Sequence, residues 1–255
     1  MNFTDRLFFK QAEFQQANAK QVWSGQAWFK KNWPQHCFLC GARCYQQTLC
    51  PACEQELPLL SPPFCTVCAS PLASTSAPSI CGNCLRKPPA YHHTIAGWQY
   101  RWPLDRLIHA FKFHHQFSLL PVLAEPLLDR LRDQPAPDIL VPMPLHPQRL
   151  RQRGYNQALL LAQYLSRQMK LPVLKTACQR TRHTTEQSGL SRVERVSNLR
   201  HAFICAAAVR GQHIALIDDV MTSGSSAHWL AQALLTAGAS SVNCWILART
   251  PPNDA

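Results

Sequence analysis

The chain has 255 residues, of which 46% are hydrophobic and 16% are charged, a composition typical of globular rather than disordered proteins. Its formal net charge of +12 favours phosphorylated small molecules or nucleic acid as ligands, although a solvated basic surface would give the same excess. No apolar run approaches the roughly 18 residues of a membrane span, and residues 1–20 lack the apolar segment of a signal peptide. We therefore expect a cytoplasmic protein.

Composition divides the chain into three regions. Residues 1–35 are rich in Gln, Lys and aromatic side chains and are interpreted as an N-terminal extension. Residues 36–90 are rich in cysteine and proline, with little hydrophobic periodicity. Residues 91–255 alternate apolar runs of strand length with stretches of helical periodicity, which is typical of an α/β domain.

The cysteine-rich region contains one CxxC unit four times. In a reducing compartment, such pairs indicate metal sites rather than disulfides, and two turns of this kind complete a tetrahedral tetrathiolate site. We therefore predict a double zinc ribbon with two structural zinc ions; disulfides or an iron–sulfur cluster are the alternatives, and sequential and cross-braced pairings both fit the spacing. The expected ligands are Cys37, Cys40, Cys50, Cys53, Cys65, Cys68, Cys81 and Cys84.

Three other cysteines, Cys178, Cys205 and Cys244, have no partner at such a spacing. They are expected to be small core residues, because a free cysteine behaves as a small apolar side chain.

The C-terminal region predicts strands that alternate with helices, and so a parallel sheet covered on both faces. Asn156 stands where it can cap the second of the long helices. The predicted strands are 138–144, 213–217 and 241–248, and the predicted helices are 104–113, 156–169 and 226–238.

A pair of acids, Asp218 and Asp219, follows the strand at 213–217, at the carboxyl end where ligands of parallel sheets bind. Two adjacent carboxylates need hydrogen-bond donors, and the neighbouring hydroxyls of a ribose supply them. The loop Thr222, Ser223, Gly224, Ser225 and Ser226 leads into a helix, so its amides and hydroxyls favour a phosphate. A ribose 5-phosphate fits both features; the alternative is an ordinary strand end before a serine-capped helix.

The stretch IALIDDVMTSGSS, residues 214–226, resembles the phosphoribosyl pyrophosphate (PRPP) motif of type I phosphoribosyltransferases. The stretches CGNCLRKPP, LIHAFKF, VPMPLHPQRLRQRGYNQALLLAQYLS and RTRHTTEQSGLSRVERVSNLRHAF are similar to the ComF/GntX family, and the resemblance covers residues 36–250. It implies a double zinc ribbon ahead of a type I phosphoribosyltransferase-like domain with a parallel sheet and flanking helices.

The resemblance also implies roles for particular residues. Asp218 and Asp219 would hold the ribose hydroxyls, and Thr222 to Ser226 would hold the 5-phosphate. The loop from Pro142 to His146 stands where such folds place their pyrophosphate loop, and Mg²⁺ would accompany PRPP.

Three further features have open interpretations. Arg149, Arg151 and Arg153 are candidates for contacts with pyrophosphate or a nucleic-acid backbone, or they belong to a solvated loop. The polar segment 180–200 is either a loop that closes over a reaction centre or a surface lobe. Lys112 resembles a family position but also suits an exposed helix face.

The family is associated with natural competence and with the use of DNA as a nutrient. The sequence is therefore interpreted as a PRPP-binding phosphoribosyltransferase-like protein acting in these processes, with other DNA-uptake proteins as candidate partners. No catalytic residue is assigned, because nothing identifies an acceptor substrate. The alternative is a non-catalytic adaptor or regulator that binds single-stranded DNA and senses PRPP or a nucleotide.

Overall fold

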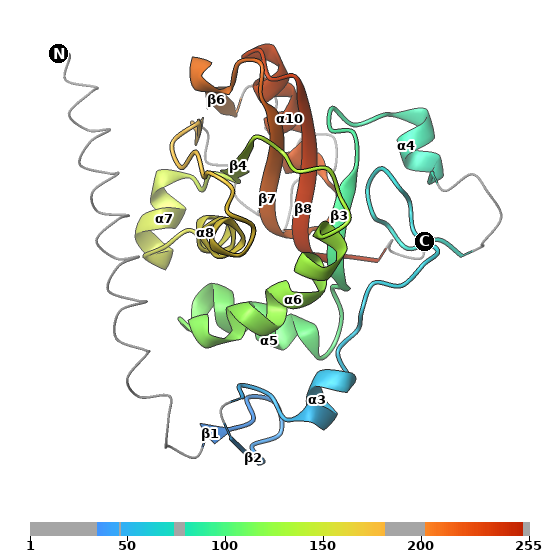
Figure 1. The fold of residues 1–255 in the computed structure, drawn as a ribbon, viewed down its shortest axis with the longest axis vertical. Coiled ribbons are helices and arrows are strands. Elements are labelled where there is room, and N and C mark those ends of the chain that lie inside the picture. The colour runs from blue at the N-terminus through green and yellow to red at the C-terminus, as the bar shows by residue number, and fades with distance from the viewer. Residues whose placement is uncertain (1–34, 46, 74–79, 182–201, 252–255) are drawn as a thin grey trace. The chain divides into compact units, whose positions relative to one another are not determined.

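A computed structural model describes residues 35–45, 47–73, 80–181 and 202–251 (Figure 1). The chain divides between Glu56 and Leu57 into two compact units. The predicted extension, apart from Gln35, and residues 182–200 of the polar segment lie outside the described residues. Within the described part of the chain, no helix is long and apolar enough to cross a membrane.

The first unit is built around two CxxC turns. Strand β1 (Gln35–His36) pairs antiparallel with β2 (Arg43–Cys44), and the first CxxC forms the turn between them. The second CxxC leads into helix α3 (Pro51–Gln55), which begins with a proline that needs no hydrogen-bond acceptor at this position. Two short strands and one short helix are therefore enough to bring the two CxxC turns together.

The second unit contains a parallel four-stranded sheet in the order β3-β8-β7-β4. Pro142 at the end of β4 pairs with Ile217 of β7, so the segments that follow these two strands leave the same edge of the sheet. The strands are β3 (Thr94–Gln99), β4 (Ile139–Pro142), β7 (His213–Met221) and β8 (Ser241–Arg249).

Helices flank this sheet, as predicted (Figure 1). Side chains alternate along β7: Ile214 and Leu216 share a core with Leu230 of α10, whereas α6 and α8 contact each other and pack on the sheet. In the described part of this unit the helices are α4 (Gly82–Arg86), α5 (Leu104–Phe113), α6 (Leu120–Leu131), α7 (Pro147–Arg153), α8 (Gln157–Met169) and α10 (Ser225–Thr236), with 3₁₀ turns at Phe117–Leu119 and Ala207–Val209.

The second cysteine-rich segment lies in the same compact unit as the sheet. The chain before it runs beside β3: Gln99 N donates to Pro58 O at 2.8 Å, and Leu60 N donates to Gly97 O at 3.0 Å. Leu60 is fully buried in the core that contains α10. This compact unit therefore begins before Tyr91, while the division of the chain at 35/36 and 90/91 stays a prediction.

Helix α6 approaches β3 closely because position 97 is glycine. A Cβ there would lie 3.0 Å from Leu127 N, a backbone atom of α6. The side chain of Trp98 fixes the same contact, since its indole Nε1 donates to Leu123 O at 2.8 Å.

Two sequence predictions are corrected. The strand predicted at 213–217 continues to Met221, so Asp218 and Asp219 lie inside β7 rather than after it. Cys178 and Cys205 are not independent core residues: they face each other across the antiparallel pair β5 (Cys178–Arg180) and β6 (Phe203–Cys205) and form a disulfide. Cys244 is fully buried, as predicted.

Candidate functional site

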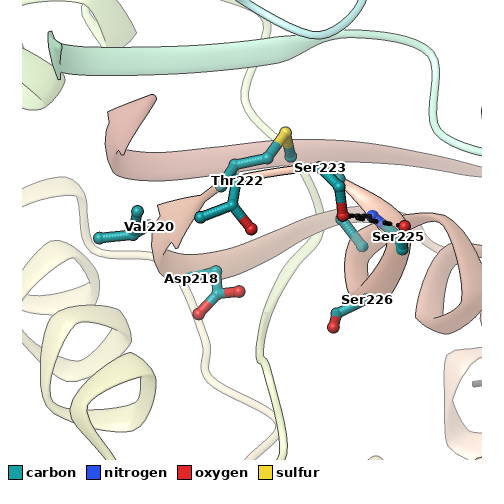
Figure 2. Close-up of a pocket in the computed structure, with 9 residues that line it drawn as sticks. Asp218, Val220, Thr222, Ser223, Ser225 and Ser226 are labelled. Carbon is teal, nitrogen blue, oxygen red and sulfur yellow. Dashed lines mark hydrogen bonds between the residues drawn. The ribbon is translucent and has the colours of Figure 1, made fainter. Parts of the chain in front are cut away.

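The two adjacent acids of β7 are separated by the alternation of the strand. Asp219 is 3% exposed, and its Oδ2 lies 3.1 Å from Nζ of Lys112 on α5. Asp218 is half-buried and lines a pocket with the loop that follows (Figure 2). Because successive side chains of a strand point to opposite faces, one carboxylate is neutralised by α5 while the other faces the pocket.

Asp218 has an unusual proton affinity. Burial, and then the charge of Asp219, raise the pKa of its carboxyl to about 8, although Asp219 N–H and Lys112 act in the other direction. Asp219 N donates to Asp218 Oδ1 at 2.9 Å. At neutral pH this carboxyl therefore holds a proton much of the time, and it can both donate and accept a hydrogen bond.

The loop between β7 and α10 supplies the opposite side of the pocket (Figure 2). Thr222 and Ser223 are exposed, and Gly224 precedes the first residue of α10. Ser223 Oγ accepts from Ser225 N at 3.3 Å and lies 2.9 Å from Ser225 Oγ. The amides, hydroxyls and helix N-terminus together suit an anion.

Gly224 is required by two constraints at once. Its φ of +75° lies in the left-handed region, and a Cβ at this position would lie 2.9 Å from the hydroxyl of Tyr91. Tyr91 is buried, so its ring cannot move aside easily. The loop therefore rests on a residue that follows directly on the second cysteine-rich segment.

The segment from Pro142 to His146 joins β4 to α7 at the same edge of the sheet as the acids. Asn156 fixes it, since Nδ2 donates to Met143 O at 3.0 Å while Oδ1 accepts from Ala158 N at 2.9 Å. The predicted cap of α8 thus also holds this segment in place.

The structure does not bring the three candidate arginines to one surface. They lie on the short helix α7, where residues four apart share a side, so half-buried Arg149 and Arg153 lie together and exposed Arg151 lies away from them. Arg153 stacks 4.6 Å over the ring of Phe113 and donates to Gln157 Oε1 at 2.6 Å.

Helix α5 contributes more to the site than the sequence indicated. Lys112 binds Asp219, and Tyr155 donates its hydroxyl proton to Phe111 O, which ties α5 to the start of α8. Burial raises the pKa of Tyr155 to about 12, so it stays a donor. The overlooked signal was the position of Lys112, four residues after buried Ile108 and hence on the apolar side of the helix.

The eight predicted cysteine ligands form two sequential groups of four, which excludes the cross-braced pairing. Within each group all sulfur atoms lie within 4.8 Å of one another, and Cys40–Cys50 and Cys68–Cys81 are 3.7 Å apart. A tetrahedral zinc site with Zn–S bonds of about 2.3 Å requires sulfurs about 3.8 Å apart. The first cluster is Cys37, Cys40, Cys50 and Cys53, and the second cluster is Cys65, Cys68, Cys81 and Cys84.

The turns favour the thiolate form of one cysteine in each cluster. Burial opposes ionisation of Cys37 and Cys65, but backbone N–H groups point at both sulfurs and lower the pKa to about 6 for Cys37 and to about 7 for Cys65. Cys81 N, for example, donates to Cys65 Sγ at 3.3 Å. The donor set therefore fits structural zinc in both clusters.

Comparisons with known proteins agree with this organisation. A family model described as a double zinc ribbon domain matches residues 31–85. Competence protein F of Haemophilus influenzae is 36% identical over 210 residues, which cover 79% of this chain and 90% of the relative. The chain belongs to the ComF/GntX family. DNA utilization protein YhgH of Escherichia coli K12 is 37% identical over 193 residues, which cover 73% and 84% of the two chains.

More distant similarities extend the comparison. Competence protein ComFC of Bacillus subtilis is 26% identical over 80% of this chain and 85% of its own. Among solved structures, a B. subtilis glutamine PRPP amidotransferase matches 51% of this chain and 26% of its own, with 16% identity and a TM-score of 0.36. A purine phosphoribosyltransferase from Pyrococcus horikoshii matches 64% and 95%, with 15% identity and a TM-score of 0.28.

Proposed function

We propose that the chain binds PRPP in the pocket between β7 and α10. The observation that carries this proposal is the convergence of an acid and an anion-binding loop on one pocket, with Asp218 on the strand side and Ser225 and Ser226 on the helix side. A ribose 5-phosphate presents hydroxyls and a phosphate in the same relative order. The sequence motif of residues 214–226 supports the same ligand.

Each part of the ligand has a group to receive it. Asp218, which faces the pocket, would orient the ribose hydroxyls, and Asp219 would support it from the other face of the strand, where it pairs with Lys112. The amides and hydroxyls from Thr222 to Ser226 would hold the 5-phosphate. The segment from Pro142 to His146 would lie beside the pyrophosphate, and Mg²⁺ would be bound by the ligand's own phosphate oxygens rather than by a protein cage.

A transferase reaction at this site would exchange one bond at C1 of the ribose for another. The bond from C1 to the pyrophosphate oxygen breaks, pyrophosphate leaves with the electron pair, and an acceptor atom forms the new bond to C1. The acceptor gives up its proton to solvent or to a base. The site residues named above orient the donor, and no residue is assigned to the acceptor.

The biological setting is proposed from the relatives. Those with the highest identities cited above are named for competence and DNA utilization. We assign this chain to DNA uptake or the use of DNA as a nutrient, in the cytoplasm, where PRPP is available and single-stranded DNA and other uptake proteins are the candidate partners.

Calorimetric titration with PRPP and Mg²⁺ tests the proposal. The wild type should bind, and Asp218→Asn/Asp219→Asn should lose most of the affinity. The matched control is Asp129→Asn/Asp133→Asn, which removes two exposed acids near the end of α6 and should bind like the wild type. No binding by the wild type, or unchanged binding by the Asp218/Asp219 variant, would overturn the assignment; pyrophosphate release with candidate acceptors then separates enzyme from sensor.

A second candidate function is the adaptor that binds single-stranded DNA. It is favoured by the exposed residue Phe113, over whose ring the guanidinium of Arg153 lies, because an aromatic ring and a guanidinium plane both stack on bases. Binding of single-stranded DNA should weaken steeply with salt and weaken further in Arg149→Ala/Arg153→Ala, which removes the two arginines that share a side of α7. Salt-independent binding, or equal binding by the double variant, would exclude this surface.

A further inference from the structure

Arg249, the last residue of β8, joins two parts of the second unit that the proposed function treats separately. It is 8% exposed. Its Nε donates to Cys68 O at 2.7 Å, and one Nη donates to the carbonyls of Met221, Thr222 and Thr250. The other Nη lies 4.0 Å from Cys68 Sγ. One guanidinium therefore contacts both a ligand of the second cluster and the start of the phosphate loop.

The charge of Arg249 has a specific partner. Among the described residues no carboxylate forms an ion pair with it. A buried cation without a counter-ion is costly, so a negative group is needed nearby. Four thiolates around one Zn²⁺ carry a net charge of about −2, and Cys68 is one of them. The loaded second cluster thus supplies the counter-ion that the carboxylates do not.

The hydrogen bonds of Arg249 also set the direction of loop amides. In a trans peptide the N–H points away from the C=O of the same unit. Because the carbonyls of Met221 and Thr222 turn toward Arg249, the N–H groups of Thr222 and Ser223 turn away from it. These residues line the pocket, so the orientation leaves their amides available to an anion there.

We propose that Arg249 is a positioning residue that couples the second cluster to the phosphate loop. The ligand's identity rests on the proposed function, but the contacts between Arg249, the cluster and the loop do not. Zinc in the second cluster holds Arg249, and Arg249 holds the loop in the conformation that accepts a phosphate. Because coupling between two sites is reciprocal, a phosphate ligand should slow the loss of zinc from the second cluster.

Zinc release to a chromogenic chelator tests the coupling, with every variant made in a Cys40→Ser background so that only the second cluster is intact. Arg249→Met should speed release by about tenfold or more, because the buried positive charge that faces the anionic cluster is removed. Arg249→Lys keeps the charge without the planar fork and should give an intermediate rate. Arg106→Met, which removes an exposed arginine of α5, is the matched control and should release zinc like its parent.

The same assay measures reciprocity. Saturating inorganic phosphate or PRPP should slow zinc release in the parent and have no effect in Arg249→Met. If Arg249→Met releases zinc at the rate of its parent, the charge interaction between Arg249 and the second cluster is overturned. If phosphate still slows zinc release in that variant, the coupling through Arg249 is overturned. If Arg249→Met does not fold, Arg249→Lys decides by the same two criteria. Release rates without ligand test the counter-ion even if PRPP proves not to bind, which would sink only the proposed function.

Discussion

The two four-cysteine clusters have the same spacing rule and different surroundings. In the first cluster Cys40 is exposed, and helix α3 beside it buries no residue. In the second cluster Cys65 is fully buried, and the segment belongs to the same compact unit as the sheet. Arg249 contacts the second cluster, and the hydroxyl of Tyr91, just after that cluster, leaves no room for a Cβ at position 224. The spacing of the cysteines thus specifies a metal site, while the residues packed around a cluster determine which other parts of the protein depend on its metal.

The largest difference is expected between one cysteine variant of each cluster. Cys65→Ser should release the second zinc, lower the melting temperature of the unit from Leu57 to Ala255 and weaken PRPP binding, because a structural zinc contributes about 10–16 kcal/mol to folding in zinc-finger peptides. Cys40→Ser should release the first zinc but leave the melting temperature of that unit and the affinity for PRPP unchanged. Metal analysis measures the zinc content, calorimetry the PRPP binding and thermal unfolding the melting temperature. Equal effects of the two variants would contradict the proposed difference between the clusters.

The contact between Tyr91 and the loop gives a second contrast. Gly224→Ala and Gly211→Ala both place a Cβ at positive φ, +75° and +73°, but a Cβ at 211 meets no atom within 4 Å. Each should cost about 1–2 kcal/mol of stability for the backbone alone. Gly224→Ala should cost more and weaken PRPP binding, because its Cβ meets the Tyr91 hydroxyl. Urea unfolding compares the two.

Tyr91→Phe offers a check on the cause. In Gly224→Ala/Tyr91→Phe the extra cost should fall toward the value for Gly211→Ala, because the hydroxyl at 2.9 Å is gone. An undiminished cost would show that the loop backbone, not Tyr91, is responsible.

A further contrast concerns Asp218, which does not contact the second cluster. Its folded-state pKa is raised to about 8 from 3.8, so the protonated form stabilises the fold below pH 4, and this contribution is lost as the pH rises through about 8. Between pH 6 and pH 9 the wild type should therefore lose more unfolding free energy than Asp218→Asn. Urea unfolding at both pH values measures this, and parallel pH profiles would contradict the raised pKa.

Features set by local sequence were predictable. The cysteine spacing gave both clusters, helix 104–113 has the predicted bounds, and Asn156 caps α8 as expected. Contacts between distant positions were not: Arg249 meets Cys68 across 181 positions, and no local pattern marks that pairing. The aspartates also looked like residues beyond a strand end, because a polar pair usually ends an apolar run, whereas pairing with β8 carries β7 on to Met221.

The central claim is that one pocket binds a sugar through its acids and a phosphate through its loop. Two small probes test this claim most directly. Ribose 5-phosphate and inorganic phosphate are titrated calorimetrically into the wild type and into Asp218→Asn/Asp219→Asn. The wild type should prefer ribose 5-phosphate, and the variant should bind both probes with the affinity of phosphate alone, because only the loop still contributes. An unchanged preference for ribose 5-phosphate in the variant would contradict the assignment of the acids to the sugar.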